Sequence, residues 1–430
     1  MKRCPTCNRT FSDESISFCL VDGAVLSPPF ELGGVGEESP SDLYPTIPSL
    51  GLPINLERQN SAAPLKRRDR RLWIISIVLL IIALAIGIFT LVRVRNEGTA
   101  PSESNKHNVR VSSEQWKLRA TLSGHSGSVV SIAFSPDKQT LASATNGESV
   151  KIWNIVTGEV KRELTSPAQI HSVVFSPSGN VLVGVGFRDT GKKRNGLNTM
   201  ADVGLRMWDT RTNKPPRLIN TSTFILSAAF SADGRTIATG GCGRDCEKGG
   251  ELIIWDAENG KPKAVLKGHS QAVLTVLFSP DNKMIASGSA DKTIKLWDVQ
   301  GGALIRTLTG PTDMIKSVSF SPDGKLVACA SDDKSVRVWD VQSGEMKVTL
   351  ENADQSLGSV AFSPDGTTIA VGSGIKENSG QILLWDVRTW TLRLTLSGHK
   401  DRVRTIAFAA DGKTLASGSE DKTVKLWERN

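Results

Sequence analysis

A chain of 430 residues is about three times the usual domain size of roughly 150 residues, so more than one folded unit is expected. Hydrophobic residues make up 39% of the chain and charged residues 22%, with 39 Gly and 19 Pro. This composition is typical of a folded, turn-rich protein and excludes a fully disordered or collagen-like one. The formal net charge of +8, from 52 Lys+Arg against 44 Asp+Glu, raises the question of nucleic-acid binding.

The location of the charge argues against that function. Residues 1–65 carry four basic and eight acidic side chains (−4), residues 66–95 carry seven and one (+6), and residues 96–430 carry the remaining +6. The first segment therefore has the wrong sign for phosphate affinity, and the densest positive charge is confined to thirty residues. No nucleic-acid partner is expected.

The first 26 residues contain a possible zinc site. Cys4-Pro-Thr-Cys7 can supply two thiolates at adjacent corners of a zinc tetrahedron, and Cys19 can supply a third. Asp22 stands where a fourth cysteine is usual, and its carboxylate is an acceptable zinc ligand. The alternatives are free thiols, and an Asp22 that merely closes a turn. The stretch resembles the short zinc ribbons at the N-termini of many bacterial membrane and signalling proteins, which implies a structural zinc ion. Residues 27–65 are rich in Pro and Gly and are expected to be a flexible linker.

A transmembrane helix is predicted over residues 72–92. These twenty-one residues carry no charge, and at 1.5 Å per residue they would span about 31 Å, the thickness of a bilayer core. A 71-residue leader precedes them, which argues against a cleavable signal peptide. Five basic residues precede the segment and two follow it, so the N-terminus is expected in the cytoplasm and the rest outside. Residues 96–113 are expected to be a second linker.

Residues 114–430 contain seven repeats. Each holds a Phe-centred turn motif such as Phe320-Ser-Pro-Asp-Gly, followed by a tryptophan, with successive tryptophans 42 to 55 residues apart. Short runs of alternating hydrophobicity between Asp/Gly turns predict three or four antiparallel strands in each repeat. The tryptophans are Trp153, Trp208, Trp255, Trp297, Trp339, Trp385 and Trp427.

Two dipeptides in these repeats carry a family resemblance. Gly-His precedes the first strand at 124–125, 268–269 and 398–399, and Trp-Asp ends the third strand in five repeats. The region is similar to the WD-repeat family, and this resemblance implies a mainly β, seven-bladed propeller. The last repeat lacks an outer strand, and residues 115–122 are expected to supply it and close the ring.

The resemblance also implies a structural hydrogen-bonded network of His, Ser, Asp and Trp inside a blade. Two blades carry the full set, and in the others it is incomplete: Gly147 replaces the Asp of the first blade, and Cys329 the Ser of the fifth. Repetition at a fixed offset indicates a structural rather than a hydrolytic role. The complete sets are His269, Ser287, Asp291 and Trp297, and His399, Ser417, Asp421 and Trp427.

The variable parts of the repeats are the candidate binding surface. In WD-repeat propellers the loop between the second and third strands lies on the partner-binding top face, and it is lengthened here at residues 187–203, 242–250 and 374–381. The residue six before each Phe of the turn motif faces the same rim in the family. Aromatic, Met and Arg side chains are enriched at interfaces, and scattered apolar surface is the alternative. The candidate partner-binding residues are Gln169, Phe224, Met314, Arg402, Arg188, Lys192, Lys193 and Arg194.

Cys242 and Cys246 could form a disulfide outside the cytoplasm, or remain as two free thiols. The sequence offers no Gly-rich phosphate loop, no HExxH and no nucleophile elbow, so we expect no enzyme and no small-molecule substrate. His171, inside an inner strand, is expected to be a hydrogen-bonded core group. The favoured function is a membrane-anchored scaffold for protein partners, bacterial by the ribbon resemblance, with the propeller outside the cytoplasm and the zinc ribbon inside. The alternative is an enzyme or small-ligand sensor that uses the propeller's centre and its top-face loops.

Overall fold

A computed structural model describes residues 2–3, 10–11 and 115–430, apart from 148, 167, 195–196, 244–248, 352–354 and 376–377. The side chains of residues 2–3, 10–11, 189–202 and 375–379 are also outside the description. The chain forms two compact units, Met1–Ser112 and Ser113–Asn430. In the first unit, β1 (Lys2–Arg3) pairs antiparallel with β2 (Thr10–Phe11).

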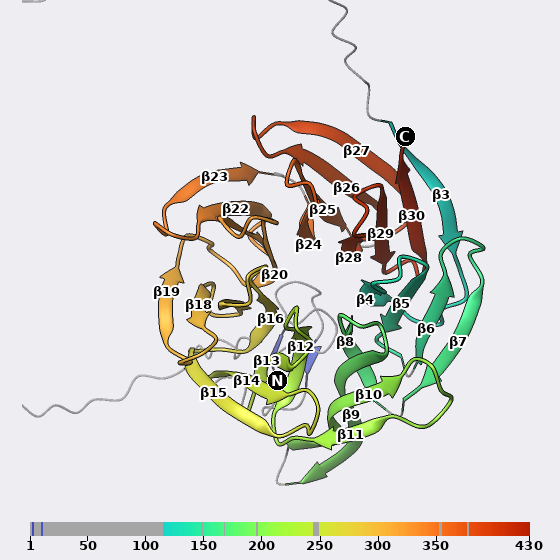
Figure 1. Cartoon of the computed structure of the whole chain (residues 1–430), viewed down its shortest axis with the longest axis vertical. Helices are drawn as coiled ribbons and strands as arrows, with labels where there is room; N and C mark the ends of the chain where they lie inside the picture. Colours follow the sequence, from blue (N-terminus) through green and yellow to red (C-terminus); the bar gives the residue numbers. More distant parts are fainter. Residues whose placement is uncertain are drawn as a thin grey trace, which may run out of the picture. The chain divides into compact units, whose positions relative to one another are not determined.

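The second unit is a ring of seven four-stranded antiparallel sheets, which confirms the predicted seven-bladed propeller (Figure 1). Consecutive strands of the chain are neighbours in each sheet, and the first strand of each blade is the innermost. Blade one comprises β4 (Val129–Phe134), β5 (Thr140–Thr145), β6 (Ser149–Asn154) and β7 (Val160–Thr165). Blade two comprises β8 (Gln169–Phe175), β9 (Val181–Arg194), β10 (Leu197–Asp209) and β11 (Arg217–Asn220). Blade three comprises β12 (Phe224–Phe230), β13 (Thr236–Cys242), β14 (Gly250–Asp256) and β15 (Pro262–His269).

The remaining four blades follow the same order. Blade four comprises β16 (Val273–Phe278), β17 (Met284–Ser289), β18 (Ile294–Asp298) and β19 (Leu304–Leu308). Blade five comprises β20 (Ile315–Phe320), β21 (Leu326–Ser331), β22 (Ser335–Asp340) and β23 (Met346–Glu351). Blade six comprises β24 (Ser356–Phe362), β25 (Thr368–Ile375), β26 (Asn378–Asp386) and β27 (Leu392–His399). Blade seven comprises β28 (Val403–Phe408), β29 (Thr414–Ser419), β30 (Val424–Arg429) and β3 (Trp116–Leu122).

The two ends of the repeat region meet in the seventh blade, as the sequence predicted. β3 pairs antiparallel with β30, in a register that places Leu122 opposite Val424. The Lys425 ammonium donates to the Thr121 hydroxyl at 2.8 Å. Leu122 is only 2% exposed and belongs to a core cluster that joins the seventh blade to the first. β3 thus covers an edge of β30 that would otherwise expose unpaired backbone groups.

The turn motif has a local cause. In the fifth blade the Ser321 hydroxyl donates to Asp323 at 2.6 Å and accepts from the Leu326 amide at 2.9 Å, which holds the turn between the first two strands. Gly324 has a φ of 71°, in the left-handed region that favours glycine. Core clusters between adjacent blades, such as the one that contains Trp339, then join the sheets into a ring.

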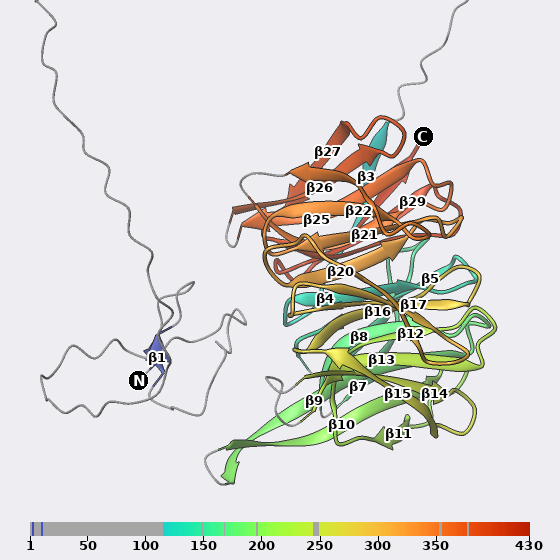
Figure 2. The same cartoon turned by 90° about the vertical axis from the view of Figure 1, so that its left-hand side faces the viewer.

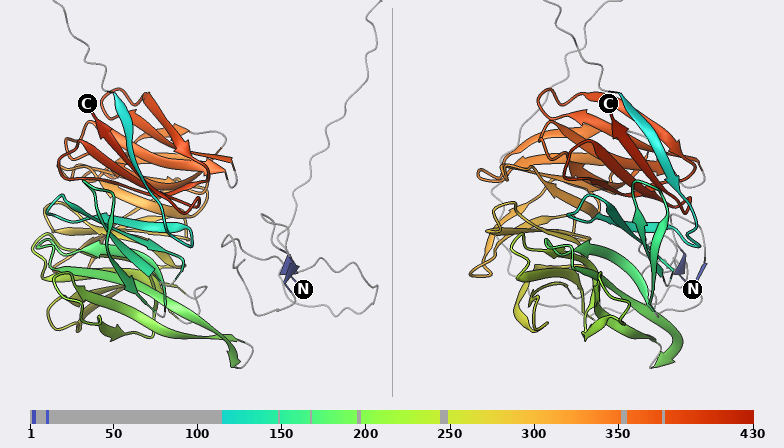
Figure 3. Two further views of the ribbon diagram at one scale, coloured as in Figure 1. Left: turned by 90° about the vertical axis from the view of Figure 1, so that its right-hand side faces the viewer. Right: turned by 45° about the vertical axis from the view of Figure 1, so that its right-hand side comes forward.

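The two faces of the ring are defined by strand direction. We call the face where the innermost strands begin the top face; the second strands end there, because Gln169 pairs with Phe187 and Phe224 with Cys242. The Ser-Pro-Asp turns lie at the opposite, bottom face. β9 and β10 have 14 and 13 residues, and their hairpin extends beyond the other blades (Figures 2 and 3).

Candidate functional site

The fourth blade holds a complete chain of four buried side chains. Trp297 Nε1 donates to Ser287 Oγ at 2.8 Å, which is also 2.8 Å from His269 Nε2. The other imidazole nitrogen, Nδ1, is 2.8 Å from Asp291 Oδ2. Burial disfavours the charged form of Asp291, but hydrogen bonds from His269 and Thr293 outweigh it and hold the pKa of this carboxyl well below its usual range.

The seventh blade repeats this arrangement. Trp427 Nε1 donates to Ser417 Oγ at 2.9 Å, and His399 lies 2.8 Å from both Ser417 Oγ and Asp421 Oδ2. Ser287 and Ser417 are fully buried, and each hydroxyl is held between an indole and an imidazole. A serine without access to solvent cannot attack a substrate, so the geometry suits a structural network better than a hydrolytic triad.

The first blade lacks the carboxylate. His125 Nε2 is 2.6 Å from Ser143 Oγ, which accepts from Trp153 Nε1 at 2.7 Å. With Gly147 at the Asp position, His125 Nδ1 is buried without a hydrogen-bond partner. Burial, with a smaller effect of Lys151, lowers the pKa of His125 to about 4. This imidazole is therefore neutral at pH 7.

The fifth blade replaces the network by an ion pair. Asp333 lies 2.6 Å from Arg337 and accepts a hydrogen bond from the Thr312 amide at 2.8 Å. Cys329 has a free thiol, is fully buried and packs in the core cluster of the fourth and fifth blades. Burial raises the pKa of Cys329 to about 12, so the thiol is not a nucleophile at neutral pH.

The candidate partner-binding residues of the top face differ in exposure. Gln169 and Arg188 are exposed, whereas Phe224, Met314 and Arg402 are half-buried. The rings of Phe224 and Phe187 lie 5.2 Å apart, and those of Phe187 and His171 lie 4.8 Å apart. Phe187, at the base of the long hairpin, therefore covers part of Phe224. The other three candidates, Lys192, Lys193 and Arg194, lie in β9, where the description covers only the backbone.

Charged side chains of the fifth and seventh blades form a group near Arg402, which we call the basic cluster: Lys316, Arg402 and Arg404 with Asp332 and Glu420. Arg402 lies 2.7 Å and Arg404 3.4 Å from the same Glu420 oxygen. Lys316 lies 2.9 Å from Asp332. Ser356, another predicted rim position, links the two halves, because its hydroxyl lies 3.2 Å from Arg402 Nη1 and 3.5 Å from Asp332 Oδ1.

Lys316, Arg404 and His171 occupy one structural position that the sequence prediction missed. Each innermost strand has a register shift near its top end, and these residues lie at the shift. They stand four residues before the Phe of the turn motif, whereas the predicted rim positions stand six before it. The full set is Val130, His171, Leu226, Leu274, Lys316, Gly358 and Arg404.

His171 is not the hydrogen-bonded core group that the sequence suggested. Its Nε2 is buried without a hydrogen-bond partner. Burial lowers the pKa of His171 to about 4, and the positive charge of Arg404 contributes to the shift. This effect places His171, of the second blade, within electrostatic range of the seventh blade across the ring.

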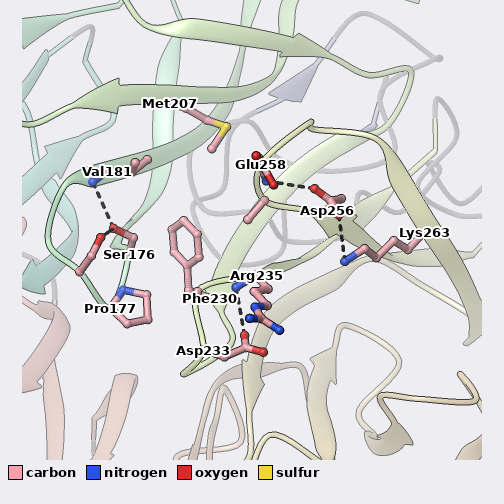
Figure 4. Close-up of a pocket in the computed structure, with 13 residues that line it drawn as sticks. Ser176, Pro177, Val181, Met207, Phe230, Asp233, Arg235, Asp256, Glu258 and Lys263 are labelled. Carbon is pink, nitrogen blue, oxygen red and sulfur yellow. Dashed lines mark hydrogen bonds and ion pairs between the residues drawn. The ribbon is translucent and has the colours of Figure 1, made fainter.

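A hollow of about 460 Å³ lies at the bottom face between the second and third blades (Figure 4). Pro177, Val181, Met207 and Phe230 form its apolar lining. The residue after Trp-Asp in the third blade is Ala257, where buried Val341 fills the matching position of the fifth.

The structure describes one of the two cysteines of the third blade. Cys242, at the end of β13, is disulfide-bonded and 1% exposed. Cys246 lies outside the described residues, so the pairing of Cys242 with Cys246 stays a prediction.

The predicted zinc ligands, Cys4, Cys7, Cys19 and Asp22, also lie outside the description, as does the predicted span over residues 72–92. Within the described part of the chain, no helix is long and apolar enough to cross a membrane. Among the same residues, no group of three or more His, Cys, Asp or Glu side chains could hold a metal ion.

Comparison with protein families identifies WD40 repeats in this chain. The family model for the WD domain, G-beta repeat, matches residues 116–154, 260–298, 302–340, 344–386 and 390–428. The chain therefore contains five WD40 repeats within its seven-bladed propeller. The matches leave out residues 155–259, which contain the outer strand of the first blade, the whole second blade and three strands of the third. The long hairpin, the Phe187–Phe224 contact and the bottom hollow all involve this divergent part.

Several curated proteins are similar to about half of the chain. It is 29% identical over 205 residues to Protein FIZZY-RELATED 3 of Arabidopsis thaliana, covering 47% of this chain and 39% of that protein. The chain is 28% identical over 182 residues to eukaryotic translation initiation factor 3 subunit I of Emericella nidulans, and this match covers 41% of the chain and 51% of that protein. The chain thus spans about half or less of these relatives. Both come from eukaryotes, so the expected bacterial origin stays a prediction.

Proposed function

We propose that this protein is a non-enzymatic scaffold that binds a protein partner on the top face of its propeller, over the second and third blades. The observation that carries this proposal is that the part of the propeller outside the WD40 matches also bears the most extended surface feature, the β9–β10 hairpin. A rigid ring with a variable loop on one face is a common design for binding sites. One relative is named as a subunit of a translation initiation factor, which agrees with a role in an assembly.

The proposal includes that this protein has no enzymatic activity. The two Ser-His-Asp groups are sealed in the blades, and the Cys329 thiol is protonated and buried. Neither gives a substrate access to an activated nucleophile.

Shortening the hairpin tests the binding face. Asp189 pairs with Met200, so residues 190–199 can be replaced by Asn-Gly, a two-residue turn that suits directly opposed strand ends. In crosslinking and mass spectrometry from intact cells, we expect the full chain to capture a partner that the shortened variant loses. The matched control is Lys325→Glu, at an 80% exposed side chain of the bottom face, which should leave capture intact. Equal capture by all three proteins would reject the top face.

We further propose that the scaffold is anchored by residues 72–92, with the N-terminus in the cytoplasm and the propeller outside it. The apolar length and the excess of basic residues before the segment support this topology. We also propose a structural zinc ion held by Cys4, Cys7, Cys19 and Asp22. The pairing of β1 with β2 brings together the chain on either side of the Cys4–Cys7 motif, as a zinc knuckle requires.

One labelling experiment tests topology and zinc together. With this arrangement, a membrane-impermeant maleimide should label Cys4 and Cys7 only after the cells are permeabilised, and only after a chelator has removed zinc. The variant with both cysteines changed to Ser identifies their share of the label. Labelling of intact cells would contradict the topology, and labelling of permeabilised cells without a chelator would contradict the zinc site.

A further inference from the structure

The basic cluster at the top of the inner strands presents positive charge to solvent. It contains three cations and two carboxylates, from the fifth and seventh blades, with Ser356 of the sixth blade between them. The cations are the more accessible members: the side chains of Arg404, Lys316 and Arg402 are 39%, 29% and 23% exposed. Asp332 and Glu420 are 18% and 15% exposed. The carboxylates are thus less exposed than the cations with which they pair.

The pairing inside the basic cluster leaves positive charge uncompensated. Arg402 and Arg404 share one carboxylate, Glu420. Burial among the inner strands, and next the charge of Arg402, lowers the pKa of Arg404. Glu420 and Asp332 offset only part of this effect, so a further carboxylate beside Arg404 would relieve the repulsion.

The same structural position is mostly apolar on the other side of the ring, where the neutral imidazole of His171 in the second blade is the polar exception. Where the fifth and seventh blades carry Lys316 and Arg404, the first, third and fourth carry Val130, Leu226 and Leu274. The Phe187–Phe224 pair adjoins this apolar half at the top face. The centre of the top face is therefore divided into a cationic half and an apolar half.

We propose that the centre of the top face binds an acidic peptide segment of the protein partner, with a carboxylate at Arg402 and Arg404 and an adjacent apolar side chain against Leu226, Leu274 and Phe224. This inference rests on the proposed function and adds the chemistry of the partner. Lys316 receives a second acidic residue. A nucleic acid fits less well, because its continuous phosphate charge would meet the apolar half of the surface.

The probe is a phage-displayed random dodecapeptide library, selected against the full chain in detergent micelles. Selected peptides should be enriched in Asp or Glu next to Leu, Ile, Phe or Met. For a synthetic peptide of the selected sequence, Arg404→Gln should weaken binding about tenfold or more, consistent with the loss of a charge-assisted pair. Changing the peptide Glu to Gln should weaken binding to the parent protein similarly, yet have little effect on binding to the Arg404→Gln variant.

Two controls keep the result specific. Arg404→Lys should retain most of the affinity, which distinguishes lost charge from a disturbed strand, and equal melting temperatures should show that both variants fold. Lys325→Gln on the bottom face should change nothing. Enrichment of basic or uncharged peptides, binding unaffected by Arg404→Gln, or tighter binding of polyuridylate than of any peptide would overturn the inference. The proposed function would survive these results if the shortened hairpin still abolished capture of the cellular partner.

Discussion

Leu122→Asp is expected to open the propeller. The side chain is 2% exposed in the core cluster between the seventh and first blades, and it lies on the strand that closes the ring. Removing a buried Leu costs about 2–5 kcal/mol, and burying an unpaired carboxylate adds to this cost. We expect a loss of at least about 4 kcal/mol of unfolding free energy, a large part of the stability of an ordinary protein. β30 would then expose an edge that favours aggregation.

The same strand offers a matched control. Leu118 lies in β3 opposite Trp427, but it is 45% exposed, so Leu118→Asp should cost less than about 1 kcal/mol. Hydrogen exchange distinguishes the two variants: Leu122→Asp should lose protection first in β3, β30 and β4, whereas Leu118→Asp should retain it. If both variants melt alike, or if protection is lost first in the fourth blade, β3 is not the weak point of the ring.

The repeats made the fold predictable because they express one local design seven times. In the fifth blade the Ser-Pro-Asp-Gly turn is closed by its own hydrogen bonds and Trp339 packs between adjacent sheets, and the other repeats vary this pattern. The last repeat lacks an outer strand, and residues 115–122, which precede the first Gly-His, supply it and close the ring. Local chemistry and ring closure together therefore determined the architecture.

The candidate site was less predictable because it depends on register. A shift in each innermost strand separates the rim position, six residues before the Phe, from the position four before it that carries Lys316 and Arg404. Comparing the repeats at the position four residues before the Phe would have shown that two of them carry a charge there. That Phe187 covers Phe224 could not be anticipated in the same way, because it depends on packing between two blades.

Acid should begin to destabilise this protein near pH 6.5, above the range in which ordinary carboxylates protonate. His125 has an ordinary pKa of 6.5 when unfolded and about 4 when folded, and His171 shows the same difference. Between these values the unfolded chain binds more protons, so stability falls as the pH drops from about 6.5 to about 4. At about 1.4 kcal/mol per pKa unit, each histidine contributes a loss of about 3 kcal/mol. Asp291 and Asp421, whose folded pKa values are lowered, contribute a separate loss below about pH 4.

The variant Gly147→Asp measures how much of this loss of stability in acid comes from His125. The backbone of Gly147 is not in the left-handed region, and its amide bonds to Thr145 Oγ1 as that of Asp291 bonds to Ser289 Oγ. An aspartate there can accept from His125 Nδ1 and complete the network, which raises the pKa of the imidazole. The urea midpoint, followed by tryptophan fluorescence, should fall less between pH 7 and pH 4.5 than in the parent protein.

Gly147→Ala is the matched control, because it adds the Cβ and changes the unfolded chain without supplying a carboxylate. A Cβ there would lie 3.2 Å from Thr145 Oγ1, so a small change in stability at pH 7 is expected in both variants. Only Gly147→Asp should reduce the dependence on pH. If Gly147→Ala reduces it equally, or if neither does, the unpartnered His125 nitrogen is not the source of the acid sensitivity. A reduction specific to aspartate would show that part of the acid sensitivity arises because this blade lacks one carboxylate.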